Sequence, residues 1–176
     1  MKKIALFFLY VTLFFMALLF FTPKENLYYY AEEQLKPLGV VVGYEEVRDR
    51  GFSLEIQHAK LFVKKIKAAN IESLVLKPYF LYNSLHVEKI ILDKTFEQFF
   101  PPLIERIDVT QSVIKPLQLH AEAIGDFGEA TANVNLLDRN VSVVLKPSKI
   151  MLSRYKNTLR QLKRSKEGTY HYESQF

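Results

Sequence analysis

The sequence contains no cysteine and has few glycines and prolines for its length. Without cysteine the chain has no disulfide, no thiol nucleophile and no cysteine-ligated zinc or iron–sulfur centre. Six glycines and seven prolines among 176 residues also exclude a collagen-like or low-complexity chain. With 49% hydrophobic and 24% charged residues, the composition is that of about one ordinary domain.

Sequence motifs for catalysis and metal binding are missing as well. The four histidines are far apart in the sequence, and none forms a metal-ligand pattern with another: His58, His86, His120 and His171. The chain has no nucleophile elbow, zinc-protease motif or phosphate-binding glycine loop. We therefore expect no catalytic residue, no metal and no cofactor. An enzyme that works through carboxylates stays as an alternative, although no carboxylate pair is identifiable.

One long apolar run is present near the start of the chain, from Ile4 to Phe21. As a helix, its 18 uncharged residues would span about 27 Å, which is close to the hydrocarbon thickness of a bilayer. A cleaved signal peptide is the alternative. Such a peptide would have a shorter apolar region followed by small residues, whereas this run ends with Phe20 and Phe21 and is followed by Pro23. We predict a transmembrane anchor over residues 1–22.

The charges that flank this run predict its orientation. Lys2 and Lys3 favour a cytoplasmic N-terminus, although Lys24 and Lys36 on the other side partly offset them. The rest of the chain is then expected outside the cytoplasm, tethered to the inner (plasma) membrane by a single pass. For such a domain we expect no nucleic-acid partner, despite the net charge of +5.

A second, juxtamembrane helix is predicted over residues 23–38. Thr22 would be its N-cap, Pro23 its first residue and Glu25 the partner in a capping box, while Pro37 would help to end it. The tyrosines at 28–30 would either form an aromatic belt at the membrane surface or pack the helix onto the domain behind it.

Residues 39–147 alternate between apolar and polar side chains, which is typical of strands with one solvated face. Turn residues interrupt the alternation at 49–51, 125–128 and 137–140. We expect eight or nine strands in a largely antiparallel sheet, so the fold class is mainly β (α+β), with a helix at each end. Within this domain, residues 93–102 predict a short helix that begins near Thr95 and separates two halves of the sheet.

The last segment, residues 148–176, is predicted to be a basic amphipathic helix and a tail. Seven basic residues and no acidic one lie between Ser148 and Lys166. Leu152, Tyr155 and Leu159 recur at helical spacing, and residues 169–172 could add an edge strand. The helix would either pack its apolar stripe on the sheet or contact a membrane or an acidic partner. The residues proposed for membrane or partner contact are Arg154, Lys156, Arg160, Lys163 and Arg164.

These features together resemble type II secretion system protein N and, more broadly, the AsmA-like envelope proteins. The resemblance lies in the anchor, the following TPKENLYYYAEEQLKPLGV segment, the strands around 51–54 and 71–78, and the Gly125-Asp126-Phe127-Gly128 turn that leads to residues 135–137. It implies a periplasmic, curved, mainly antiparallel sheet with an apolar inner surface, acting without catalysis in the Gram-negative envelope. The chain is short for this family, and the basic C-terminal segment matches no family motif.

Two functions are therefore expected. The first is a membrane-anchored periplasmic accessory protein, a scaffold or assembly component related to type II secretion, which contacts envelope or secretion proteins. Anchoring would raise the effective concentration of the domain near its partners. The alternative is a lipid-binding or lipid-transfer protein that holds acyl chains on the apolar face of the sheet.

Overall fold

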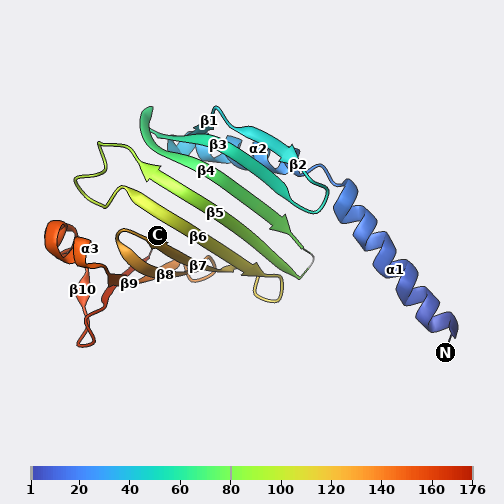
Figure 1. Ribbon diagram of the computed structural model, residues 1–176. Helices are drawn as coiled ribbons and strands as arrows, with labels where there is room; N and C mark the ends of the chain where they lie inside the picture. Colours follow the sequence, from blue (N-terminus) through green and yellow to red (C-terminus); the bar gives the residue numbers. More distant parts are fainter. Residues whose placement is uncertain (1, 80, 176) are drawn as a thin grey trace.

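One antiparallel sheet of eleven strands dominates the computed structural model, which describes residues 2–79 and 81–175 (Figure 1). This confirms the mainly β fold class. The strands are β1 (Val40–Gly43), β2 (Glu46–Asp49), β3 (Leu54–Val63), β4 (Ile66–Pro78), β5 (Tyr82–Leu92), β6 (Leu103–Ser112), β7 (Gln118–Gly125), β8 (Gly128–Asn135), β9 (Asn140–Pro147), β10 (Lys163–Arg164) and β11 (Tyr170–Gln175). Their order is β1-β3-β4-β5-β6-β7-β8-β9-β11-β10, with β2 also paired to β3.

Helices lie near both ends of the chain. They are α1 (Lys2–Phe21), α2 (Lys24–Leu35), a 3₁₀ turn (Lys36–Leu38), α3 (Lys149–Arg154) and α4 (Lys156–Leu159). Among the described residues, α1 is the one helix long and apolar enough to cross a membrane, and none of its residues is buried. Figure 1 shows α1 leaving one end of the sheet, whereas α3 lies at the other end.

The central strands carry apolar side chains on one face of the sheet and mostly polar ones on the other, as the alternation predicts. One cross-strand row of paired residues is apolar: Leu85, Val109, Ala121, Ala132 and Val143. The adjacent row points to the opposite face and is polar: Ser84, Thr110, His120, Asn133 and Ser142. We name these two sides the apolar face and the polar face.

The alternation changes phase once along each of β3 to β6, where apolar residues follow one another at three positions instead of two. The steps are Ile56 to Ala59, Ile71 to Leu74, Val87 to Ile90 and Ile104 to Ile107. His58 and Lys89 have positive φ angles of 57° and 47° at these steps, and the pairing of β6 with β7 shifts between Ile104 and Arg106. Irregularities of this kind bend strands and re-aim side chains. They return apolar residues to the same face, so residues 54–63 form one continuous strand, β3.

Two short covers bury parts of the apolar face. At the β1–β3 edge, Tyr28 of α2 packs against a buried cluster that includes Leu54 and Ile56. At the other end of the molecule, Met151 of α3 and Leu159 of α4 pack with Leu145 and Phe127. Between these covers the apolar row is only half-buried.

The predicted helix within residues 93–102 is wrong, because this segment consists of successive turns. Phe96 N donates to Asp93 O over 2.8 Å and Phe99 N donates to Phe96 O over 2.9 Å, an i to i+3 pattern. Pro101 and Pro102 follow too soon for a helix to extend. The segment does not divide the sheet, since β5 and β6 pair on either side of it.

The single basic helix predicted from residue 148 is also wrong. The helix is interrupted at Tyr155, whose φ of −113° and ψ of 35° are not helical. Met151 is fully buried, while Leu152, expected on the apolar stripe, is exposed. The interruption lets both Met151 and Leu159 reach the sheet. Lys163 and Arg164 then form β10, and the predicted edge strand is β11, which lies between β9 and β10.

Candidate functional site

The junction between α1 and α2 is built around a buried lysine. Lys24 is 1% exposed, and its Nζ donates to Leu19 O and Thr22 O, each over 2.9 Å. These are carbonyls at the end of α1, so a cation there complements the negative end of the helix dipole. Nζ also lies 3.6 Å from Asp49 Oδ1. One side chain thus ties the end of α1 to the end of β2.

Asp49 caps α2 from a distant part of the chain. Its Oδ2 accepts from Lys24 N over 2.9 Å and its Oδ1 from Gly51 N over 2.8 Å. Burial opposes ionisation of Asp49, but these backbone hydrogen bonds and the charge of Lys24 outweigh it, so the pKa of Asp49 lies below its ordinary value. The predicted Thr22 cap is wrong: Thr22 Oγ1 donates back to Leu18 O, and α2 begins at Lys24.

Aromatic packing adds to this junction. The rings of Phe20 and Phe52 lie 5.3 Å apart, edge to face. Gly51 has a φ of +80°, and a Cβ at this position would overlap the Phe20 ring. The side of α1 continues as an apolar groove of about 880 Å³, lined by α1 residues and by Phe52, Tyr79 and Leu81. The end of α1 is therefore integrated into the sheet domain.

The tyrosines of α2 divide between the two predicted roles. Tyr28 packs on the sheet, and its hydroxyl lies 3.4 Å from Glu45 Oε1. Burial, together with the nearby Glu45 carboxylate, raises the pKa of Tyr28 well above its ordinary value. Tyr29 and Tyr30 are exposed, so they remain candidates for the membrane surface.

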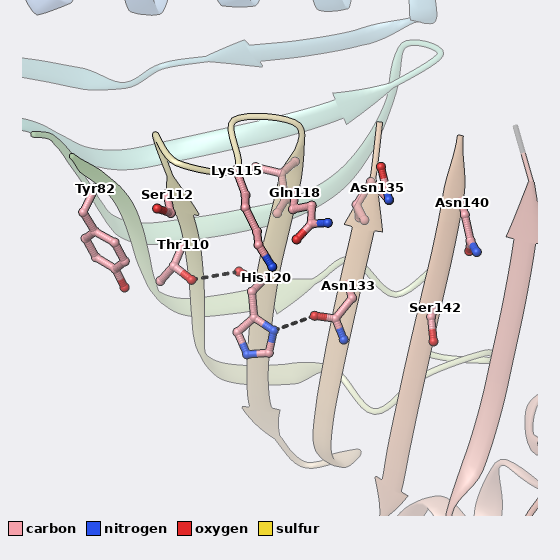
Figure 2. Close-up of a pocket in the computed structure, with 12 residues that line it drawn as sticks. Tyr82, Thr110, Ser112, Lys115, Gln118, His120, Asn133, Asn135, Asn140 and Ser142 are labelled. Atoms are coloured by element: carbon pink, nitrogen blue, oxygen red, sulfur yellow. Dashed lines mark hydrogen bonds between the residues drawn. The ribbon is translucent and has the colours of Figure 1, made fainter. Parts of the chain in front are cut away.

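The polar face contains a pocket of about 460 Å³ (Figure 2), lined in part by residues at the ends of β6 and β8 that lie toward α1. Hydroxyl and amide side chains dominate its lining, with Lys115 as its lysine. Thr110 Oγ1 lies 3.4 Å from His120 O, and His120 Nδ1 lies 2.8 Å from Asn133 Oδ1. Among the residues that the structure describes, none of those lining the pocket carries a carboxylate. Such a surface offers hydrogen-bond donors and acceptors to a partner.

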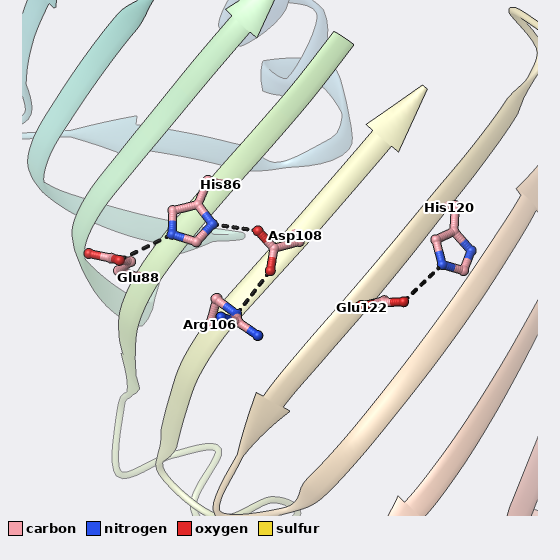
Figure 3. A network of polar contacts seen from close by, with 6 residues as sticks. All are labelled: His86, Glu88, Arg106, Asp108, His120 and Glu122. Atoms are coloured by element: carbon pink, nitrogen blue, oxygen red, sulfur yellow. Dashed lines mark hydrogen bonds and ion pairs between the residues drawn. The ribbon is translucent and has the colours of Figure 1, made fainter. Parts of the chain in front are cut away.

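Two histidines on this face have acidic neighbours (Figure 3). His86 Nδ1 bonds to Asp108, which also pairs with Arg106 Nε at 2.9 Å, and His86 Nε2 lies 3.1 Å from Glu88 Oε1. The hydrogen bond to Asp108, with that to Glu88, raises the pKa of His86 above its ordinary value.

His120 is arranged in the same way on β7. Its hydrogen bond with Asn133, and a contact of 3.3 Å to Glu122, raise the pKa of His120. In the sequence these histidines look isolated, because their cross-strand partners Asp108 and Asn133 depend on the register of the strands. The i, i+2 spacing of His86 with Glu88 was the signal in the sequence, since such pairs share a strand face. Within residues 2–79 and 81–175, no group of three or more His, Asp or Glu side chains could hold a metal ion.

The five proposed contact residues are all exposed, at the end of the sheet opposite α1: Arg154, Lys156, Arg160, Lys163 and Arg164. Three of them, Lys156, Arg160 and Arg164, line one shallow hollow with Leu152 and Tyr170, whereas Arg154 and Lys163 do not line it. The eight residues of β9 extend from the α1 end of the sheet to this end, a length of about 25 Å at 3.3 Å per residue. These basic residues therefore lie at the end of the sheet away from α1.

In comparisons with protein-family models, curated proteins and solved structures, no match to this chain was found.

Proposed function

We propose that this protein is a single-pass, membrane-anchored accessory protein of the bacterial envelope that acts without catalysis. Its sheet domain would lie outside the cytoplasm and bind other envelope components, and the resemblance to type II secretion protein N and AsmA-like proteins makes secretion or envelope assembly the process we favour. The observation that carries the proposal is α1, an apolar helix of 20 residues with no buried side chain. At about 30 Å it matches the hydrocarbon core of a bilayer.

The α1 junction supports retention of the helix over its removal as a signal peptide. Cleavage after Phe21 would separate Lys24 from Leu19 O and remove Phe20 from the Phe52 ring. The buried ammonium would then lose one of its hydrogen-bond acceptors. The lysines at 2 and 3 favour a cytoplasmic N-terminus, so the domain would be held just outside the membrane at high effective concentration.

Membrane extraction tests the anchor. After alkaline carbonate treatment, the full-length chain should stay in the membrane pellet with its N-terminal residues intact by mass spectrometry. Replacing Leu13 and Phe14 together by arginine should release it or prevent insertion, since each central arginine costs about 2.5–3.5 kcal/mol. The matched control, Leu152→Arg, alters an exposed apolar residue outside α1 and should be retained. A mature chain that starts after Phe21 and is freely soluble would contradict the proposed membrane anchor.

A reporter fused after Phe176 tests the side of the membrane. An enzyme that is active only outside the cytoplasm should be active in this fusion. Activity only of a reporter that works inside the cytoplasm would contradict the proposed orientation.

Lipid binding is the second candidate function, and the half-buried middle of the apolar face is the observation that favours it. An acyl chain could cover the row that includes Ala121 and Ala132. Mass spectrometry of protein purified in mild detergent should then find stoichiometric lipid. Ala132→Glu should abolish the bound lipid, whereas Thr131→Glu, its neighbour on the polar face of β8, should not. Absence of lipid from the native chain would leave the scaffold function.

A further inference from the structure

The turns at the α1 end of the sheet carry exposed apolar side chains. Because the strands are antiparallel, the turns β2–β3, β4–β5, β6–β7 and β8–β9 all lie at this end. Each carries an exposed, large apolar side chain: Phe52, Leu81, Ile114 and Leu137. The last three are 71%, 84% and 73% exposed. We name these four residues, with Leu117 and Leu136, the apolar rim.

The rim is continuous through its backbone. Val113 N donates to Leu81 O over 3.1 Å, which joins the β4–β5 turn to the β6–β7 turn. Leu136 N donates to Leu117 O over 2.8 Å, which joins the β6–β7 turn to the β8–β9 turn. These hydrogen bonds hold three of the turns side by side, so their apolar side chains form one edge.

The rim lies where α1 leaves the sheet. Phe52 contacts Phe20 near the end of α1, and Leu81 lines the groove beside the helix with Val11 and Phe15. Figure 1 shows α1 and the β6–β7 turn at the same end of the sheet. If α1 spans the bilayer, the rim therefore faces the same membrane surface.

Basic side chains accompany the apolar ones. Arg50, Lys115 and Arg139 are exposed in three of these turns. Arg50 pairs with Glu55, and Asp138 hydrogen-bonds to Asn135, so the acidic groups nearby have partners within the domain. Apolar side chains flanked by lysine and arginine are typical of surfaces that insert into the interface of anionic membranes.

We propose that the apolar rim docks into the outer surface of the membrane that holds α1, so that the sheet stands end-on with Ile114 and Leu137 inserted among anionic lipids. This inference rests on the proposed membrane anchor. It adds a second, peripheral contact that fixes the orientation of the domain, with the polar pocket close to the headgroups and the basic C-terminal residues turned away from them.

Single-cysteine labelling tests the docking, because the chain has no native cysteine. The full-length chain is reconstituted into vesicles of phosphatidylcholine with phosphatidylglycerol. An environment-sensitive fluorophore is placed in separate variants at Ile114→Cys, Leu137→Cys, Glu97→Cys and Phe14→Cys. Glu97 is exposed in the β5–β6 loop at the far end of the sheet and is the matched control. Quenchers are either attached to the lipid chains or dissolved in the water.

The lipid-borne quencher should remove most of the emission from positions 114 and 137, while the label at 97 should respond only to the aqueous quencher. Omitting phosphatidylglycerol should weaken the lipid quenching at 114 and 137 and leave that at 14 unchanged. If 114 and 137 respond only to the aqueous quencher while 14 is in lipid, the docking is wrong and the anchor stands. A third outcome is a blue shift of the emission at 114 and 137 without quenching by the lipid-borne quencher. It would mean that protein, such as a second copy of the chain, covers the rim, and it would also overturn the proposal. A label at 14 that stays in water contradicts the anchor.

Discussion

The two ends of the sheet differ in how much of their apolar surface the chain itself covers. At the end opposite α1, Phe127 of the β7–β8 turn is buried beneath α3 and α4, and the β3–β4 turn is formed by Lys64 and Lys65. At the α1 end, Ile114 and Leu137 are 84% and 73% exposed. The far end also exposes Phe99 and Phe100, at 51% and 45%, but its helices cover Phe127, whereas, in the turns at the two ends, the most exposed apolar side chains lie at the α1 end. The molecule is polarised along its strands, and we attribute this to the membrane.

The largest difference should appear when one apolar residue is truncated at each end. Leu159→Ala removes a buried side chain from the α3–α4 cover and should lower the free energy of unfolding by about 2–5 kcal/mol. Ile114→Ala removes a side chain that is 84% exposed and should change stability in detergent by less than about 0.5 kcal/mol. Urea unfolding followed by circular dichroism measures both. Equal losses would show that Ile114 packs within the domain and would remove the contrast.

The α1 junction should be the next most sensitive position. Asp49→Asn removes the carboxylate from Lys24 and should cost about 1–3 kcal/mol at neutral pH. Since the folded pKa of Asp49 is lowered, its contribution is present above the pKa of the unfolded chain and fades as pH falls through the folded value. The stability difference between the two proteins should therefore shrink in acid.

Glu46→Gln is the control for the junction. Glu46 lies on the same strand and pairs with Arg48, but both side chains are more than half exposed, so its loss should cost at most about 1 kcal/mol. If Asp49→Asn were as mild as Glu46→Gln, the junction would not be what holds α1 to the sheet.

Charge-reversal variants test whether the basic residues at the far end, rather than those at the rim, bind an acidic partner. We expect Lys156→Glu with Arg160→Glu to weaken association with an acidic envelope protein by about 0.2–1 kcal/mol per charge, and the remaining binding to be less salt-dependent. Lys115→Glu at the rim should leave this association unchanged. Pulldown from membranes at two salt concentrations measures it. If both reversals act alike, the partner does not distinguish the two ends.

The smallest expected effect concerns the polar face between the ends. Because the folded pKa of His86 is raised, its stabilising contribution is complete below the ordinary histidine pKa and is lost as pH rises through the folded value. His86→Gln should therefore cost about 0.2–1 kcal/mol near pH 6 and almost nothing near pH 9. Ser84→Ala, on the same strand face, should show no such dependence on pH. Unfolding at the two pH values compares them, and a pH-independent loss in His86→Gln would contradict the ion-pair account.

Local patterns predicted much of this fold, because strand alternation and turn residues depend on neighbouring positions. The turns at 49–51, 125–128 and 137–140 and the helix before Gly39 follow from such signals. The three-residue step from Ile56 to Ala59 is also visible in the sequence, but a strict alternation with a period of two does not predict it.

The errors arose where distant residues decide the local structure. Asp49 replaces Thr22 as the cap of α2 from 25 residues away, and no local pattern encodes that contact. The helix break at Tyr155 depends on Met151 and Leu159 both reaching the sheet. The apolar rim could not be predicted from the sequence for the same reason, since its four turns come to one end of the molecule only once the strands pair.

The accessibility of single cysteines in intact cells tests the central claim most directly. With the outer membrane permeabilised, a maleimide that cannot cross the inner membrane should label Glu97→Cys in the far-end loop. It should not label Lys3→Cys until the inner membrane is lysed. Labelling of Lys3→Cys but not Glu97→Cys in intact cells would place the sheet domain in the cytoplasm and contradict the account.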